Sequence, residues 1–446
     1  MSEPIRQAEA DPVAGRTSRR RVARGGVLPA ERSLAPDLAR GLMLLLIVLS
    51  NTGFHLWAAK LGPSGWHAVD GSTADRVVQF LMIVVLDLRI YPLFAFLFGY
   101  GMMQLYRRQT EAGTSEKGAV ALLRRRSLWL IVVGFAHAAL LMAGDIIGFY
   151  GLLSLIFGWL FLRRGNRVLL IAAGAVLTLQ VLSGLPSILE LAGGNVAEVG
   201  TAAGDTGRVA YASGEENALT AAGTRMATWV FVAIVSPLPA FTAQAVLLLG
   251  FWAARRRILE EPGSHLPLLR RTAVLGIAVG WLGGLPQALA HIGVLDVPAG
   301  AVALDGPFAA IQATTGVAGG LGYVALITLI AHRMSERVRR SRPVVAVAAV
   351  GKRSLSSYLA HSLIFSPVLA AWGFGLGGKL TSASMALFAV GVWLVTVAAA
   401  YALERAGRRG PAETVLRRLV YRSADRSQPE RAGPVDGSSA SGRSVH

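Results

Sequence analysis

One stretch of the sequence, GFAHAALLMAGDIIGFYGLL from Gly134 to Leu153, places a histidine and an aspartate in an otherwise apolar run. A neutral imidazole can take a proton from a hydroxyl or an amine, and a carboxylate can orient that imidazole. Ionisable side chains are costly inside a lipid bilayer, and they usually face a functional cavity there. We therefore predict that His137 is a general base and that Asp145 orients it or binds the acceptor.

The spacing of this pair sets a geometric condition. Eight residues span about 12 Å along a straight helix, which is too far for a direct hydrogen bond between His137 and Asp145. A substrate, a water molecule or a local bend must therefore lie between them. His137 lies near mid-depth and Asp145 lies about 12 Å further toward the outside, so we predict that Gly144–Asp145–Ile146 forms the external hairpin between the third and fourth spans.

Other polar residues also fall inside apolar runs, and they are candidates to line a substrate-binding cavity. The helix rise places Asn51, His137 and His361 at similar depths on three separate helices. An arginine at such a site can hold a phosphate or another anion. The alternative is structural, because intramembrane polar groups also join helices, and Asp37 and Arg40 are spaced to form an ion pair. The predicted substrate-binding residues are Asp37, Arg40, Asn51, His55, Asp87, Arg89 and His361, with Arg89 or Arg40 as the anion clamp.

The elements that must position these residues are long apolar segments. Hydrophobic residues make up 53% of the 446 positions and charged residues only 16%, well below a typical soluble domain. The apolar runs do not alternate, so we predict an all-α, polytopic membrane bundle. The ten expected spans are 38–58, 77–105, 127–144, 146–162, 168–191, 225–253, 270–290, 307–332, 354–372 and 384–404.

The positive charges predict how the chain is oriented. With the N-terminus in the cytoplasm, ten spans place 38 of the 44 Lys and Arg residues on the cytoplasmic side. This bias predicts that both ends are cytoplasmic. We expect a disordered basic tail over residues 1–33, a membrane domain over 34–422 and a disordered tail over 423–446.

Composition and motifs exclude several kinds of chemistry. The chain has no cysteine, so disulfides, thiolate catalysis and cysteine-based metal sites are ruled out. It also lacks a phosphate-binding Gly-rich loop with Lys-Ser/Thr, a zinc-protease histidine pair and a G-x-S-x-G nucleophile motif. Without these ligand motifs we expect no metal. We also expect no nucleic-acid partner, because the basic residues flank segments long enough to cross a bilayer.

Several segments resemble one known family. PDLARGLMLLLIVLSN, YPLFAFLFGYGM and the helix pair around His137 are similar to segments of the YeiB-like bacterial membrane proteins, a family of unknown function. GKRSLSSYLAHSLI and RRGPAETVLRRLVYR resemble the C-terminal region of that family, where Gly-Pro-x-Glu follows the last helix. The chain departs from the family pattern at His361, where glutamine is more usual, so a shared catalytic role for His361 is not implied.

The family more distantly resembles the transmembrane acyltransferase superfamily, through Asp37, Arg40 with the following glycine, and Asn51. Those enzymes transfer an acyl group from a cytoplasmic thioester donor to an acceptor across the membrane. Many O-acyltransferases have a histidine where this chain has Asn51. The resemblance therefore leaves His55, His67 or His137 to act as the base, and His137 is preferred because Asp145 accompanies it.

Three hypotheses follow for function. The first is a multi-pass acyltransferase of the bacterial plasma membrane that uses an acyl-CoA-type donor, with no bound cofactor, and a glycan or lipid acceptor of the cell envelope. The second is a transporter or flippase, because the sixth and eighth spans contain Pro and Gly. The third is a non-catalytic scaffold. The sequence leaves the oligomeric state open.

Overall fold

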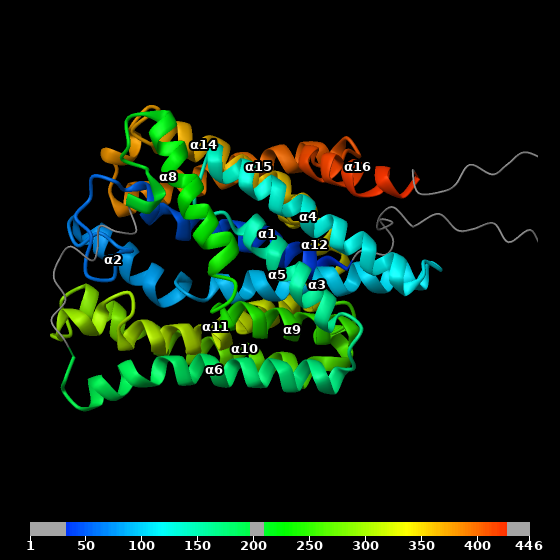
Figure 1. The fold of residues 1–446 in the computed structure, drawn as a ribbon, viewed down its shortest axis with the longest axis horizontal. Helices are drawn as coiled ribbons and strands as arrows, with labels where there is room; N and C mark the ends of the chain where they lie inside the picture. The colour runs from blue at the N-terminus through cyan, green and yellow to red at the C-terminus, as the bar shows by residue number, and fades with distance from the viewer. Residues whose placement is uncertain (1–32, 197–208, 426–446) are drawn as a thin grey trace, which may run out of the picture.

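The protein is a bundle of helices that run side by side, as Figure 1 shows. The computed structural model describes residues 33–196 and 209–425. Within these ranges the secondary structure is helical, apart from an isolated bridge between Leu61 and Ala68. The predicted all-α fold is confirmed. Most of the two tails that we expected to be disordered lies outside the described residues.

The helices before the gap are α1 (Leu34–Ser50), η2 (Asn51–His55), α2 (Thr73–Leu81), η3 (Met82–Leu86), α3 (Ile90–Glu111), α4 (Glu116–Leu140), α5 (Ile146–Phe161) and α6 (Asn166–Ala192). Those after it are α8 (Ala218–Val230), η5 (Phe231–Val235), α9 (Phe241–Arg255), η6 (Pro262–His265), α10 (Leu266–His291), η7 (Ala299–Val302), α11 (Pro307–Arg333), α12 (Glu336–Arg339), α13 (Arg342–Lys352), α14 (Ser354–Leu369), η8 (Leu376–Gly378), α15 (Ser382–Arg405) and α16 (Pro411–Asp425).

Each of the ten expected spans falls on one of these helices or on two or three consecutive ones. Seven segments of the described chain are long and apolar enough to cross a bilayer, and α5 and α9 are shorter apolar helices. The chain is therefore an integral membrane protein. The count of ten spans and the cytoplasmic location of both ends stay predictions.

The second span is broken in its middle. After α2 the chain widens into the π-helical turn η3, and α3 begins only at Ile90. Between them Leu88 has a φ of 57°, a left-handed conformation that a leucine rarely adopts. Pro92 falls in the first turn of α3, where its missing N–H costs no helical hydrogen bond. The break turns Asp87 away from the helix axis.

A second break divides the sixth span between η5 and α9, where Pro237 and Pro239 lie. The Gln244 amide donates hydrogen bonds of 2.7 Å to the carbonyl oxygens of Pro237 and Leu238, which the break has freed. The interruption that we expected in the sixth span is therefore present. The eighth span, in contrast, is the continuous helix α11.

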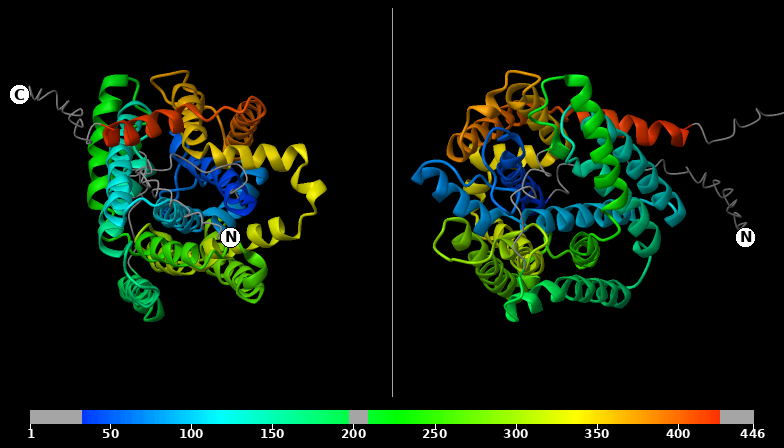
Figure 2. Two further views of the ribbon diagram at one scale, coloured as in Figure 1. Left: turned by 90° about the vertical axis from the view of Figure 1, so that its right-hand side faces the viewer. Right: turned by 60° about the vertical axis from the view of Figure 1, so that its left-hand side comes forward.

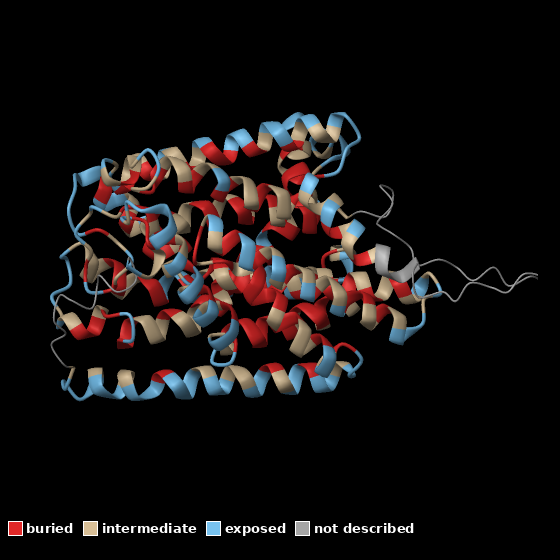
Figure 3. Cartoon of the chain, turned by 45° about the horizontal axis from the view of Figure 1, so that its top comes forward, coloured by how far each residue is buried: buried red, intermediate tan, exposed pale blue. Residues whose placement is uncertain are grey.

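Glycines allow some helices to pack closely, and the helices differ in how far they are buried in the bundle. A Cβ on Gly99 of α3 would lie 2.4 Å from the Leu247 carbonyl oxygen of α9, so these two backbones nearly touch. Figure 2 shows α1 inside the bundle, with other helices around it. Figure 3 shows the opposite case for α6, the long helix along the lower edge, most of whose surface is exposed.

Candidate functional site

Two pockets follow one another along α1 and α3. The first, which we call the arginine pocket, has a volume of about 390 Å³ and is lined by Arg40, Arg126 and Arg417 among others. The second, the His67 pocket, measures about 680 Å³ and is lined by His67 and Asp87 among others. The arginine pocket lies at the beginning of α1 and the end of α3, and the His67 pocket lies at the opposite ends of these helices.

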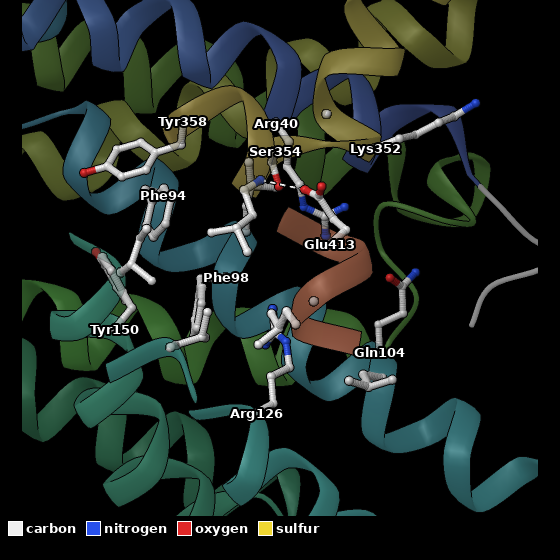
Figure 4. Close-up of a pocket in the computed structure, with 18 of the residues that line it drawn as sticks. Arg40, Phe94, Phe98, Gln104, Arg126, Tyr150, Lys352, Ser354, Tyr358 and Glu413 are labelled. Atoms are coloured by element: carbon white, nitrogen blue, oxygen red, sulfur yellow. Dashed lines mark hydrogen bonds between the residues drawn. The ribbon is translucent and has the colours of Figure 1, made fainter. Parts of the chain in front are cut away.

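The two pockets meet at a common wall, which we call the neck. It comprises the four residues that line both pockets: Phe94, Ile146, Tyr150 and Tyr358. Three of them are aromatic, and the Tyr150 hydroxyl donates a 3.3 Å hydrogen bond to the Tyr91 carbonyl oxygen. The neck thus forms a short, mostly aromatic layer between the two pockets. Figure 4 shows three of its residues beside the arginine pocket.

The arginine pocket contains unpaired positive charge. Arg40 forms the expected ion pair with Asp37 at 3.2 Å. Arg126 lies over the Phe98 ring at 5.6 Å, and Arg417 lies over the Tyr421 ring at 5.7 Å. Within the described residues, neither of these two guanidinium groups forms an ion pair with a carboxylate. Two such cations on one pocket favour an anionic ligand.

The other charged groups around this pocket are already paired. Glu413 accepts backbone hydrogen bonds of 2.9 and 3.1 Å from Leu355 and Ser356, and a further one from the Ser356 hydroxyl. It therefore caps the N-terminus of α14, which explains the glutamate of the Gly-Pro-x-Glu motif. Lys352 forms a 2.5 Å ion pair with Glu404, and Figure 4 shows its side chain extending away from the pocket.

Helix α16 covers the arginine pocket. Leu416 and Val420, one turn apart, are buried beneath it, and the Arg125 guanidinium donates a 3.3 Å hydrogen bond to the Val420 carbonyl oxygen. Burial raises the pKa of Tyr421 on the same helix, so its hydroxyl keeps its proton and can act as a hydrogen-bond donor. The helix supplies Arg417 and Tyr421 to the pocket as it closes it.

The His67 pocket contains a histidine–carboxylate pair. His67 Nε2 lies 2.6 Å from Asp87 Oδ2, and the two side chains are 12% and 24% exposed. His67 comes from the loop before α2, and Asp87 comes from the break before α3. Such a pair can fix the tautomer of the imidazole and leave Nδ1 to accept a proton. No group of three potential metal ligands occurs among the described residues.

His137 and Asp145 are in direct contact, because a bend brings them together. Helix α4 ends at Leu140 and α5 begins at Ile146, so the predicted hairpin is present and His137 Nδ1 lies 2.9 Å from Asp145 Oδ1. The expectation that the pair is too far apart for a hydrogen bond holds only for a straight helix. Asp145 also caps α5 by accepting from the Gly148 amide at 2.6 Å.

This pair lies outside both pockets. The side chains of His137 and Asp145 are 0% exposed, and neither residue is among those lining the arginine or the His67 pocket. Trp229 of α8 donates a 3.4 Å hydrogen bond to Asp145, and Arg225 of α8 donates to the last carbonyl oxygens of α4. The pair therefore joins three helices. A catalytic role for His137 stays a prediction.

Arg89, one of the two residues predicted as an anion clamp, lies outside both pockets. It is completely buried and lines neither pocket. Its guanidinium donates to the backbone carbonyl oxygens of Ile83, Asp87 and Gly280. These bonds satisfy acceptors that the broken helix leaves free and tie the break to α10.

The remaining predicted residues do not converge. Asn51 lines the His67 pocket, whereas His55 and His361 are buried outside both pockets. His55 packs edge-on against the Phe365 ring at 5.4 Å, and His361 Nε2 lies 3.0 Å from the Thr396 hydroxyl. Of the three side chains at similar depth, only Asn51 reaches a pocket.

Several pocket residues were not identified from the sequence. Arg126 belongs to the positive charges that indicate only how the chain is oriented, and nothing in the sequence marks the neck tyrosines. The available signals were Asp87 inside a span, a histidine in the loop just before that span, and the arginines flanking Gly-Pro-x-Glu. None of these signals shows which residues become neighbours.

Comparisons with known proteins agree with the resemblance seen in the motifs. The chain is 26% identical to uncharacterized protein YxaH of Bacillus subtilis, over 89% of this chain and 96% of that protein. It is 26% identical to uncharacterized protein YeiB of Escherichia coli, over 88% of this chain and 97% of that protein. No solved structure matches.

A shorter match is to an uncharacterized 39.9 kDa protein encoded in the amylase 3' region of Bacillus acidopullulyticus, which is 36% identical over 24% of this chain and 28% of that protein. Residues 253–423 match the family described as "Protein of unknown function (DUF418)". This segment includes α14 and α16, which supply Tyr358 to the neck and Arg417 to the arginine pocket. These matches make the chain a YeiB-like protein, similar to YeiB and YxaH over most of its length and to the DUF418 family over residues 253–423.

Proposed function

We propose that the protein is a membrane acyltransferase that passes a small acyl group from a donor in the arginine pocket to an acceptor in the His67 pocket. The observation that carries this proposal is the arrangement of the two pockets, which lie end to end and share the four neck residues. One pocket offers unpaired cations and the other a histidine–carboxylate pair. This arrangement matches a reaction whose two substrates arrive from opposite sides of the membrane.

The donor would be a phosphate-bearing thioester of the acyl-CoA type. Arg126 and Arg417 can bind its phosphate groups, since neither is neutralised by a carboxylate within the described residues. The Tyr421 hydroxyl adds a neutral donor beside them. The thioester arm would then point along α3 toward Phe94 and the neck.

The transfer would use His67 as the general base. The acceptor hydroxyl gives its proton to His67 Nδ1 while its oxygen attacks the acyl carbonyl carbon. The C–S bond breaks, and the leaving thiolate takes the proton back from the imidazole. The products are an ester and a thiol, and no oxidant or reductant is consumed. Asp87 would hold the imidazole in the required tautomer and stabilise its charged form.

His67 suits this role better than His137, because it lines a pocket that an acceptor can occupy. His137 has no exposed side-chain surface and its partner Asp145 caps a helix. A base must come within hydrogen-bond reach of the proton that it removes. For this reaction we propose that the protein lies in the bacterial plasma membrane. Its acceptor would be a glycan or a lipid of the cell envelope.

Mass spectrometry of the cell envelope tests this function. Lipids and glycans would be compared between a strain that lacks the gene and the same strain complemented with the wild-type chain or with His67→Gln. We expect an acyl-sized mass increment that only the wild-type chain restores. Identical spectra from all three strains, with normal amounts of protein in the membrane, would contradict the proposal.

A second candidate is a transporter, and the observation that favours it is the pair of broken helices. Asp87 lies at one break, beside a pocket, as substrate-binding residues do in many transporters. Purified protein in liposomes separates the two functions. A transporter would move an envelope precursor across the bilayer with no acyl donor present, whereas the acyltransferase would not.

A further inference from the structure

Helix α6 lies at the surface of the protein and packs against α9 and α11 along one face. Only Leu169, Ala173 and Gly184 of its 27 residues are buried. Apolar residues such as Leu182, which is 53% exposed, cover its outer surface. In a membrane this surface faces lipid, so α6 is a single-helix layer between the lipid and whatever lies behind it.

Behind this layer lies the His67 pocket. Gln180, Ser183, Gly184 and Ser187 of α6 all line that pocket. Their spacings of three, one and three residues place them on one face of the helix. The face carries the polar side chains that a headgroup would meet, whereas its neighbours on the outer surface are apolar.

The seam between α6 and α11 is made of small residues. A Cβ on Gly184 would lie 2.8 Å from the Ala310 Cβ, and Ala309 and Ala313 of α11 also line the pocket. The Ser187 hydroxyl donates a 3.3 Å hydrogen bond to the Asp305 carbonyl oxygen just before α11 begins. The two helices pack closely here, but the side chains are too short to interlock, so a small separation of α6 from α11 opens the pocket toward the lipid.

We infer that the acceptor is an amphiphile of the adjoining lipid leaflet, which enters the His67 pocket sideways between α6 and α11. Its polar headgroup passes the serines of α6 and reaches His67, and its apolar chain stays between the helices and in the lipid. The alanine-rich wall of α11 offers that chain an apolar surface. This inference rests on the proposed function and specifies its acceptor as a membrane lipid or a lipid-linked molecule.

Photolabelling in liposomes tests the route without requiring acyl transfer. The probe is a phospholipid with a diazirine on its headgroup, mixed into the bilayer, and the labelled peptides are identified by mass spectrometry. We expect adducts on the loop that contains Trp66 and His67. Ser183→Trp, which fills the pocket side of α6, should lower this labelling about tenfold, as a loss of about 1.4 kcal/mol in binding would.

The matched control is Leu182→Trp, which adds the same bulk on the adjacent, lipid-facing position of α6. It should leave labelling unchanged. A second test uses the absence of native cysteine. In Gly184→Cys with Ala310→Cys the two Cβ atoms would lie 2.8 Å apart, so a separation of the helices by about 1 Å brings them to disulfide distance, and copper phenanthroline should link them. The oxidised protein should exclude the lipid probe, and dithiothreitol should restore labelling.

Equal labelling of the Ser183→Trp and Leu182→Trp variants, or unchanged labelling after the disulfide forms, would overturn the sideways route. Labelling that follows the expected pattern in a protein that never transfers an acyl group would preserve this inference and reject the proposed function. Acyl transfer to a water-soluble acceptor at the same rate in the oxidised and reduced protein would support the proposed function and reject the sideways route.

Discussion

His67 Nε2 lies 2.6 Å from Asp87 Oδ2, although one residue belongs to a loop and the other to the interruption of a transmembrane segment. A continuous helix from α2 to α3 would give Asp87 a different direction. The break, held by the left-handed Leu88 and by the buried Arg89, is therefore what presents the carboxylate to the imidazole.

The first prediction concerns this pair. His67→Gln should lower acyl transfer by about 10²–10⁴-fold, because glutamine can form hydrogen bonds but cannot take the proton of the acceptor. The protein should remain folded, since His67 lies in a loop. Rates in liposomes and thermal unfolding in detergent measure the two effects. His265→Gln, which lies outside both pockets, is the control, and full activity of His67→Gln would remove the base from the mechanism.

The second prediction concerns the donor. Arg126→Ala should raise the KM for a phosphate-bearing thioester about tenfold to a hundredfold, because a charge-assisted hydrogen bond contributes about 1.5–3 kcal/mol. Arg124→Ala removes the same charge from an exposed position two residues away and should have little effect. Titration of coenzyme A into purified protein would show the same ranking. An equal loss in both variants would indicate general electrostatics rather than a site.

The third prediction concerns the buried pair at the α4–α5 turn. His137→Ala should lower the free energy of unfolding by about 1–3 kcal/mol, because it leaves the buried Asp145 carboxylate without its imidazole partner. Size-exclusion profiles after graded heating would measure the loss. If His137→Ala instead unfolds at the wild-type temperature but is inactive, the base predicted from the sequence is the correct one.

The fourth prediction concerns the packing of this turn. A Cβ on Gly134 would lie 2.3 Å from both Asp145 Oδ2 and the Gly148 amide nitrogen. Gly134→Ala should therefore destabilise the protein by about 1–3 kcal/mol, as overpacking does in other cores. Gly174→Ala on α6 is the matched control, because nothing lies within 4 Å of its added methyl group. Equal thermal stability of the two variants would contradict the close approach of α4 and α5.

The sequence predicted the helices well because hydropathy and length directly reflect the bilayer. It predicted the Asp37–Arg40 pair for a similar reason, since both residues belong to one helix. It could not predict the pockets, because the helix rise gives the depth of a residue but not the direction in which its side chain points. Asn51 and His361 therefore share a depth and face different surroundings.

The pairing of His67 with Asp87 could not be predicted from the sequence for another reason. It depends on a loop folding back and on a helix opening, and neither leaves a periodic pattern in the sequence. His137 and Asp145 formed the more obvious pair because they are near in sequence. The two residues are in contact because the chain turns between α4 and α5, within the eight residues that separate them.

The neck between the two pockets has a consequence for the energetics of the cell. A water-filled path through a membrane protein would let protons and ions run down the membrane potential. Here Phe94, Ile146, Tyr150 and Tyr358 replace water with side chains at the one level where the pockets meet. Ions cannot shed their hydration there at low cost, whereas an uncharged acyl group needs no hydration shell. Under the proposed function, an acyl group therefore crosses this layer while the membrane stays impermeable to ions.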